Sequence, residues 1–147
     1  MKKKSILILT ISVVVAVILL VATALGAWYF TPRVFLRGVD PAEIDRIEVF
    51  NGNTGRHFYI VRNSDISAVV ENIQGISMAR GKVSSNYNGF AFSLSFLDAN
   101  GKVIDSFIVN GLNTICDDPF FYHTSEGVLC YEHLAALEEE YFKIYID

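Results

Sequence analysis

The sequence predicts an α+β protein: an N-terminal transmembrane helix, then one domain whose mainly antiparallel sheet packs against a central and a C-terminal helix. Three observations lead to this prediction. The chain begins with a long run that carries no charge, from Ser5 to Phe30. Later segments alternate apolar and polar residues and are separated by turn formers, which is typical of antiparallel strands. Two further segments have the spacing of amphipathic helices, and helices that cover one face of such a sheet give the α+β class.

The uncharged run is long enough to cross a bilayer. A spanning helix needs about 20 apolar residues, and Ile6 to Leu25 supplies them. Trp28, Tyr29 and Phe30 follow, where aromatic rings favour the headgroup region. The lysines at positions 2–4 predict a cytoplasmic N-terminus and a domain outside the cytoplasm, because positive flanks stay inside. We therefore expect residues 6–30 to contact the lipid bilayer as a single-pass anchor of the cell membrane.

A cleaved signal peptide is the alternative interpretation of this segment. Ala22-Thr23-Ala24 and Ala24-Leu25-Gly26 both have the small-x-small pattern of a cleavage site. We favour a retained anchor because the apolar run is longer than the 7–15 residues of a typical signal core. The predicted organisation is an anchor over 1–30, a juxtamembrane linker over 31–39 and an extracytoplasmic domain over 40–147.

Composition limits the classes of partner. After position 30, 16 acidic residues stand against nine Lys and Arg, so this part has a net charge of 9 − 16 = −7. An acidic domain of this kind is a poor nucleic-acid binder, so we expect none. Its 117 residues suit one domain. The chain has no phosphate loop or dinucleotide fingerprint, and we expect no cofactor.

The first half of the domain predicts a hairpin and a helix. Asp40 caps a short helical turn with Pro41 at its first position. Alternation predicts strands over Arg46–Phe50 and His57–Val61, joined by a turn rich in Asn and Gly. A helix follows, with Asn63 or Ser64 as its cap and Gly75 as its stop. Its apolar face comprises Ile66, Val69, Val70 and Ile73.

The second half predicts a meander and a final helix. A strand around Met78–Val83 precedes an exposed loop, and loops on rigid scaffolds often carry binding residues. This candidate binding loop comprises Ser84, Ser85, Asn86, Tyr87, Asn88 and Gly89. Strands follow over 90–96, 103–109 and 112–116, and a last hairpin pairs 120–123 with 128–131. Leu134, Leu137 and Tyr141 predict a C-terminal helix, with Glu138, Glu139 and Glu140 as a solvated patch.

Cys116 and Cys130 are the only cysteines in the chain. Outside the cytoplasm, two cysteines in segments that could pair most simply form a disulfide. We therefore predict a structural Cys116–Cys130 disulfide.

Two alternatives are metal sites at or beside these cysteines. The set Cys116, His123, Cys130 and His133 has the ligand types of a zinc site, although not the spacing of a known finger. The pair Asp117 and Asp118 could help to bind calcium, but it lacks the Asp-x-Asp-x-Asp-Gly spacing of a calcium loop. We favour the disulfide and expect no metal.

Thr114-Ile115-Cys116-Asp117-Asp118, with His57 far upstream, resembles over five residues the strand that bears the catalytic cysteine of sortases. Sortases are anchored, outward-facing transpeptidases that use Cys, His and Arg. No arginine follows Cys116 here. A second cysteine would also quench a thiolate nucleophile. This resemblance implies a cell-surface thiol enzyme as the alternative function.

A broader resemblance covers more of the chain. The order Ile44-Asp45-Arg46-Ile47, a Gly-rich turn, a strand, a helix, Phe96 to Ile104 and then Tyr131 to Leu137 is similar to small extracytoplasmic domains of Gram-positive bacteria. Those domains occur in membrane-anchored and lipoprotein forms and have no established activity. The resemblance implies a bacterial envelope setting. Without a catalytic set, we expect a non-catalytic domain that binds another envelope protein, a peptide or a small ligand, at a sheet edge or at the candidate loop.

Overall fold

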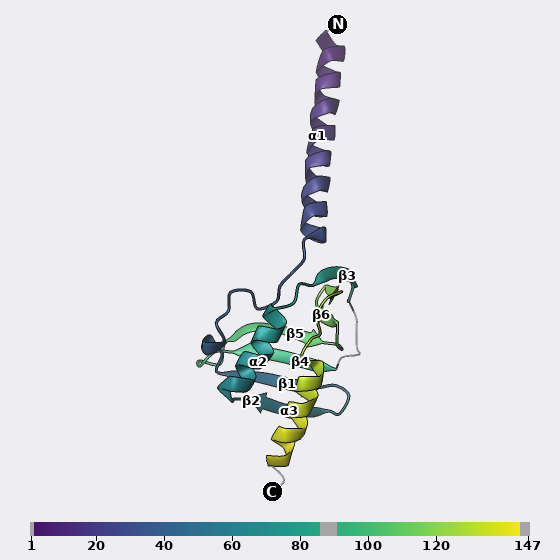
Figure 1. Ribbon diagram of the computed structural model, residues 1–147. Coiled ribbons are helices and arrows are strands. Elements are labelled where there is room, and N and C mark those ends of the chain that lie inside the picture. The colour runs from purple at the N-terminus through teal and green to yellow at the C-terminus, as the bar shows by residue number, and fades with distance from the viewer. Residues whose placement is uncertain (1, 86–90, 145–147) are drawn as a thin grey trace. The chain divides into compact units, whose positions relative to one another are not determined.

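The computed structural model describes residues 2–85 and 91–144, and the chain forms two compact units. Unit 1 is Met1–Thr31 and unit 2 is Pro32–Asp147. Figure 1 shows the elements of both units, which we describe separately. The predicted α+β class is confirmed: an apolar N-terminal helix precedes a seven-stranded antiparallel sheet with two further helices.

Helix α1 (Lys2–Phe30) is long and apolar enough to cross a membrane. Two of its hydroxyl groups bond within the helix: Thr10 donates to the Ile6 carbonyl (2.9 Å) and Thr23 to the Leu19 carbonyl. Internal satisfaction is what a lipid environment demands, since no water is present to accept these bonds. The predicted apolar helix is therefore present, with ends close to those expected.

The sheet has the strand order β2-β1-β4-β5-β6-β7-β3, and every pair is antiparallel. Most of its order follows the chain, so hairpins between neighbouring segments form the greater part of it. The exception is β3, which lies next to β7 at the far edge from β2. The strands are β1 (Arg46–Asn51), β2 (Arg56–Ile60), β3 (Ala79–Val83), β4 (Phe92–Leu97), β5 (Val103–Val109), β6 (Thr114–Asp117) and β7 (Phe120–His123).

Both helices of the domain pack on one face of this sheet (Figure 1). Helix α2 (Asn63–Gln74) buries the four predicted residues, Ile66, Val69, Val70 and Ile73, and Gly75 caps its C-terminus. Its N-cap is Arg62, not Asn63 or Ser64, and that cap makes no side-chain hydrogen bond. The face of the sheet beneath the helices supplies much of the core from alternate positions, including Ile47, Val49, Phe58, Ile60, Leu94, Phe96, Phe107, Val109, Ile115 and Tyr122.

Helix α3 (Tyr131–Ile144) corrects the prediction of a solvated glutamate patch. Glu138 is only 3% exposed. Its carboxylate accepts hydrogen bonds from Asn51 Nδ2 (2.6 Å) and Thr54 Oγ1 (2.7 Å). The prediction was wrong for Glu138 because α3 crosses the β1–β2 turn, whose polar side chains satisfy a carboxylate that packing takes out of water. Glu139 and Glu140 are exposed, as expected.

The segment predicted as a linker, 31–39, is instead part of the folded domain from Pro32 onwards. Arg33 and Met78 exchange two backbone hydrogen bonds of 2.8 Å. Phe35 and Leu36 are buried in the core, where the Phe35 ring packs against those of Phe107 and Tyr122. We call residues 32–39 the strap. Phe35 and Leu36 form no helix or strand, yet their side chains pack into the core of the domain.

The predicted hairpin between 120–123 and 128–131 is also absent. Strand β7 pairs with β6 and β3 instead. The run after Gly127 adds no strand because Leu129 and Cys130 are both buried in the core and Tyr131 already begins α3. Alternation in this run reflects a loop that fills the core rather than a strand.

Candidate binding site

Strand β2 is an open edge of the sheet. Hydrogen bonds alternate along an antiparallel strand, and Gly52 N–H donates to the Ala91 carbonyl beside β4 (2.7 Å). The peptide groups of the odd-numbered β1 residues therefore point toward β2, where their register partners are the even-numbered residues. The peptide groups of the odd-numbered β2 residues, His57 and Tyr59, consequently point away from β1, to the outside of the sheet. The bond from Val61 N–H to the Tyr141 hydroxyl is consistent with this alternation, since Val61 also points outward. Among the described residues, no strand pairs with this edge.

Helix α3 holds both ends of β2 in place. At one end, Arg56 pairs with Glu139 (2.7 Å) and lies 3.8 Å from the buried carboxylate of Glu138. At the other end, the Val61 and Arg62 N–H groups donate to the Tyr141 hydroxyl at 3.3 and 3.4 Å. The middle of the strand is left as a regular, fixed edge.

An ion-pair network reinforces the second end. Arg62 bridges Asp65 and Glu140, each at 2.7 Å, and lies over the Tyr141 ring. The hydrogen bonds that the Arg62 guanidinium donates to these two carboxylates, first to Glu140 and then to Asp65, raise its pKa. These contacts join the start of α2 to the end of α3.

The opposite edge is irregular, and the chain itself covers the residue directly before it. The Arg33 backbone pairs with Met78 directly before β3, and the β3–β7 ladder is irregular between Arg80 and Val83. Arg33 also pairs with Asp117 and lies over the rings of Phe35 and Tyr122. A bulge and a covering segment are both ways in which proteins prevent pairing at an edge.

The second face of the sheet carries no helix among the described residues. Toward the β2 edge, His57 Nε2 lies 2.7 Å from Glu48 Oε1. Across the central strands, Ser95 and Ser106 are direct partners, and a shallow polar cavity of about 330 Å³ lies on this face. The cavity is lined by Ser93, Ser95, Ser106, Phe107, Ile108, Cys116, Asp117 and Asp118.

The predicted Cys116–Cys130 disulfide is not formed, because both residues are free, buried thiols. Cys130 belongs to the core on the helix side of the sheet. Ile115 is also in that core, so the next residue, Cys116, points to the opposite face. The sheet therefore separates the two sulfur atoms, which the spacing of the cysteines along the chain could not reveal.

Neither thiol is prepared for nucleophilic chemistry. Desolvation raises the pKa of Cys116, with the charges of Asp118 and Asp117 acting in the same direction and a hydrogen bond to Ser84 opposing them. Desolvation raises the pKa of Cys130 to about 12. Four strand spacings separate β2, which carries His57, from β6, or about 19 Å. His57 and Cys116 cannot form the dyad of a thiol transpeptidase.

The predicted metal-site residues are not brought together either. The described residues contain no group of three or more His, Cys, Asp or Glu side chains that could hold a metal ion. His123 Nδ1 lies 3.0 Å from Thr114 Oγ1, and His133 is exposed on α3. Asp117 pairs with Arg33, and Asp118 accepts a hydrogen bond from Ser84 Oγ (2.6 Å).

Only the start of the candidate binding loop is described. Ser84 is buried, and its N–H donates to the Pro119 carbonyl (2.8 Å), so this residue anchors the loop to the sheet. Ser85 is exposed. Asn86, Tyr87, Asn88 and Gly89 lie outside the described residues.

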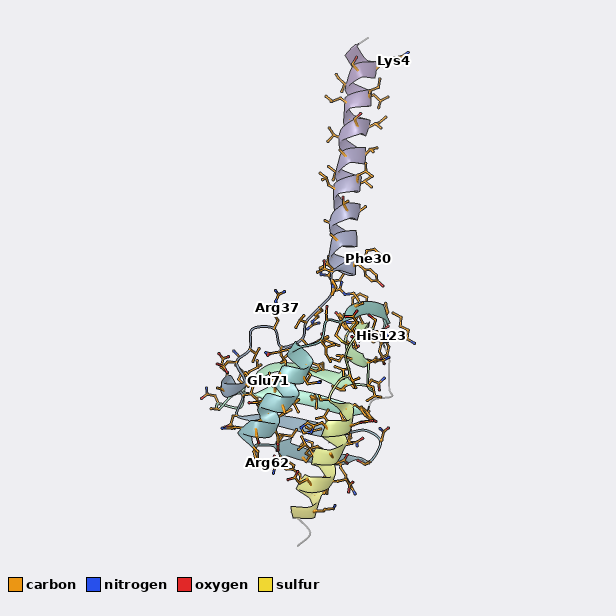
Figure 2. The ribbon with its side chains drawn as sticks, viewed as in Figure 1. Lys4, Phe30, Arg37, Arg62, Glu71 and His123 are labelled. Carbon is orange, nitrogen blue, oxygen red and sulfur yellow. The ribbon has the colours of Figure 1, made fainter. Side chains whose placement is uncertain are left out.

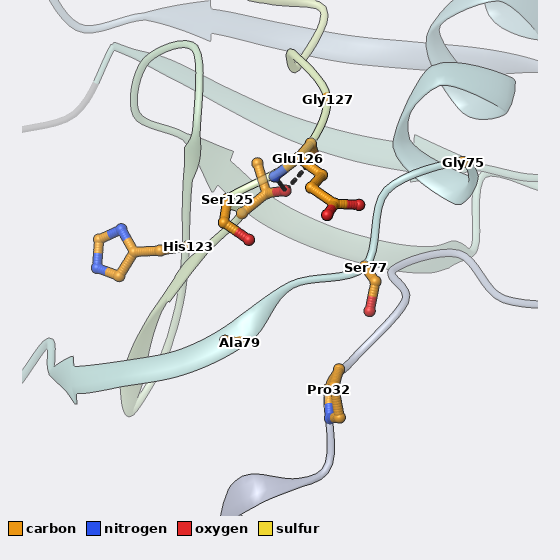
Figure 3. Close-up of a pocket in the computed structure, with 9 residues that line it drawn as sticks. Pro32, Gly75, Ser77, Ala79, His123, Ser125, Glu126 and Gly127 are labelled. Carbon is orange, nitrogen blue, oxygen red and sulfur yellow. Dashed lines mark hydrogen bonds between the residues drawn. The ribbon is translucent and has the colours of Figure 1, made fainter.

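A second cavity, of about 380 Å³, lies between the β7–α3 loop and the segment that leads from α2 to β3 (Figure 3). Ser125, Glu126 and Ser77 contribute polar groups to its wall. Figure 3 shows the His123 ring directed away from Ser125 and Glu126, so these three do not form a catalytic triad. The cavity has the character of a small binding site.

The sequence analysis missed the bonds that hold the β2 edge and the cavity that contains Glu126. Tyr141 was recognised only as an apolar position of a helix, although its hydroxyl is what holds the end of β2. Glu126 lay in a run taken as a simple turn. Figure 2 shows the wider arrangement, with Arg62 and His123 in different regions of the domain.

Comparisons with protein-family models, curated proteins and solved structures find no match for this chain.

Proposed function

We propose that this protein is a single-pass membrane protein whose domain lies outside the cytoplasm and binds an extended segment of another envelope protein at the β2 edge. The apolar helix α1 supports membrane anchoring, and the N-terminal lysines support a cytoplasmic N-terminus. The resemblance of the chain to Gram-positive extracytoplasmic domains supports a bacterial envelope as the setting. Binding, not catalysis, is the activity that these features favour.

The open and fixed β2 edge is the observation that carries the proposal. An added strand would receive hydrogen bonds from the outward peptide groups of His57 and Tyr59, which is the general mode of β-strand addition. Because α3 holds both ends of β2, little conformational freedom would be lost when a segment binds. The β3 edge is a less regular template, because its ladder is irregular between Arg80 and Val83 and the Arg33–Met78 pair lies directly before it.

Side chains beside the edge would supply specificity. In β-strand addition the backbone gives affinity, and alternate side chains select the sequence. His57 and Tyr59 point to the helix-free face, and their rings are 5.1 Å apart in an edge-on arrangement. Tyr59 is 44% exposed, so it is available to a cross-strand neighbour. Aromatic and β-branched residues make the most favourable cross-strand partners for such a residue.

Photo-crosslinking in cells tests the proposal. A benzoylphenylalanine that replaces Tyr59 in the full chain keeps an aromatic ring at the edge. We expect one discrete, saturable adduct. The variant His57→Pro removes an outward N–H without breaking the β1–β2 ladder, since proline is tolerated where an edge N–H faces solvent. This variant should abolish the adduct while the melting temperature of the domain stays close to that of the wild type.

The matched control places the same crosslinker at Val103, another exposed apolar position, on β5 and three strand positions away from β2. It should give only low, diffuse labelling of abundant membrane proteins. An adduct at position 59 that survives His57→Pro, or that is no more specific than the one at Val103, would overturn the proposal.

A further inference from the structure

The cavity of Figure 3 has the chemistry of a second binding site, far from β2. Its wall includes residues before and within β3 and after β7, the two strands at the opposite side of the sheet. A ligand in this cavity would therefore not compete with a segment paired to the β2 edge. Most residues that line it are polar or have small side chains. One side comprises Pro32, Gly75 and Ser77, and the other comprises Ser125, Glu126 and Gly127.

The lining is rich in hydrogen-bond acceptors and carries negative charge. The Glu126 carboxylate forms no ion pair with any described residue and projects toward the Gly75–Ser77 segment (Figure 3). Gly75 caps the C-terminus of α2, where the helix dipole is negative, and α2 has no basic residue in its last turn. Among the residues that the structure describes, no Lys or Arg lines the cavity. A positively charged donor is the complement to such a set.

The loop that carries Glu126 is held in position. Thr124 is buried, its Oγ1 accepts a hydrogen bond from Glu126 N–H (3.0 Å), and it donates back to the Glu126 carbonyl. The Thr124 N–H donates to the Asn113 carbonyl (3.0 Å), which ties the loop to the sheet. Gly127 follows with φ 83°, a left-handed conformation that favours glycine. Glu126 therefore projects from a fixed turn rather than from a mobile tip.

We propose that this cavity binds a primary ammonium group on a short aliphatic stem. The ammonium would pair with the Glu126 carboxylate and donate to the hydroxyls of Ser77 and Ser125, while the stem would contact Pro32 and Ala79. The same chemistry is offered by a small free amine and by a lysine side chain of another protein. The site does not depend on the function proposed for the β2 edge.

Titration of the isotope-labelled full chain in phosphocholine micelles tests this proposal by NMR. The probe is n-butylammonium chloride, with sodium chloride at the same ionic strength as the reference. We expect amide shifts that saturate in the millimolar range, because a solvent-accessible ion pair is weak. The shifts should be confined to Gly75, Ser77, Ser125, Glu126 and Gly127. Added salt should weaken the binding, since exposed charges are screened.

Four variants make the result specific. Glu126→Gln should weaken binding about fivefold, whereas Glu132→Gln, which removes one charge from an exposed position of α3, should leave it unchanged. Thr124→Val removes the hydroxyl that positions Glu126 and should also weaken binding. Thr124→Ser should restore it, which separates a positioning role from a general loss of stability.

Uncharged 1-butanol is the decisive control. Equal shifts with butanol, or an unchanged affinity in Glu126→Gln, would overturn the proposal. A short peptide with one central lysine distinguishes the two sources of the ammonium group. Tighter binding of the peptide than of butylammonium indicates a lysine side chain on a protein partner, and equal or weaker binding indicates a small amine.

Discussion

The two edges of the sheet are treated differently. At the β3 edge, the strap supplies one backbone pair, between Arg33 and Met78, directly before the strand, and the β3–β7 ladder is irregular. At the β2 edge, α3 contacts both ends of the strand, and the outward peptide groups between them have no strand partner among the described residues. One edge is irregular, and the other is regular and held at both ends.

This difference teaches where the domain can accept a partner. An unprotected edge is a template for aggregation, and proteins normally cover, bend or charge it. Here the chain uses such devices at β3 and fixes β2 without covering it. A fixed edge keeps the pairing geometry that a partner needs, while the short length of β2 limits uncontrolled association. The predictions below alter first the irregular edge and then the regular one.

Removing the Phe35 ring should have the largest effect. Phe35 is 1% exposed and packs against two aromatic rings, so Phe35→Ala should lower the free energy of unfolding by about 3–5 kcal/mol. Chemical denaturation of the full chain in detergent, followed by circular dichroism, measures this change. Arg37→Ala, at an exposed strap position, is the control and should have almost no effect. A loss below about 1 kcal/mol for Phe35→Ala would mean that Phe35 does not anchor the strap in the core.

Removing the buried carboxylate of Glu138 should loosen the turn that begins β2. Glu138→Ala leaves Asn51 Nδ2 and Thr54 Oγ1 without their acceptor, and we expect a loss of about 2 kcal/mol. Glu132→Ala, on the same helix but exposed, should change stability by less than about 0.5 kcal/mol. Equal effects of the two variants would show that Glu138 is solvated, as the sequence first indicated.

Removing the Tyr141 hydroxyl should affect the other end of β2. Tyr141→Phe keeps the ring but deletes the acceptor of the Val61 and Arg62 N–H groups, at a cost of about 1 kcal/mol. Hydrogen exchange should accelerate at those two amides and not at Ile47 or Val49 in β1. Uniform acceleration across the sheet would point to global destabilisation and against a local clamp.

The smallest effect concerns pH at the strap. Desolvation raises the pKa of Asp105, which accepts a hydrogen bond from the Leu36 N–H. A raised carboxyl pKa means that the native state binds the proton more tightly than the unfolded chain, so this contribution to stability is present below pH 3.8 and is lost as pH rises through the folded pKa. Asp105→Asn should therefore stabilise the domain at pH 7.

The same variant should make little difference near pH 3, where Asp105 is protonated in both states. Denaturation of both proteins at the two pH values gives the comparison. A variant less stable than the wild type at pH 7 would contradict the assigned sign and show that attraction between Asp105 and Arg33 outweighs desolvation.

Much of the local structure follows from short-range patterns. The alternation in the β1–β2 and β4–β5 segments and the apolar spacing of α2 are properties of adjacent residues, so their elements were predicted close to their true bounds. The turn at Asp98–Lys102, between β4 and β5, also follows from local chemistry, because Asn-Gly readily takes positive φ and Gly101 has φ 76°. These features need no knowledge of distant partners.

The failures share one physical cause. Whether Glu138 is buried depends on the β1–β2 turn, and whether Cys116 can meet Cys130 depends on which face of the sheet each occupies. The sequence positions of these residues do not encode such relations, because burial depends on what packs against a side chain. For the same reason, the helix-like spacing of Tyr141 predicted its ring in the core but not the bonds of its hydroxyl.

The amino-acid sequence by itself determined an apolar helix long enough to cross a membrane, an acidic domain and the α+β class, since each depends on composition or on local period. Tertiary structure decided which edge of the sheet is open. Arg33 pairs with Met78, and Tyr141 bonds to Val61 across 80 positions of the chain. A strand is an open edge when no other segment pairs with it. Which segments pair depends on residues far apart in the sequence, and only folding brings these residues together.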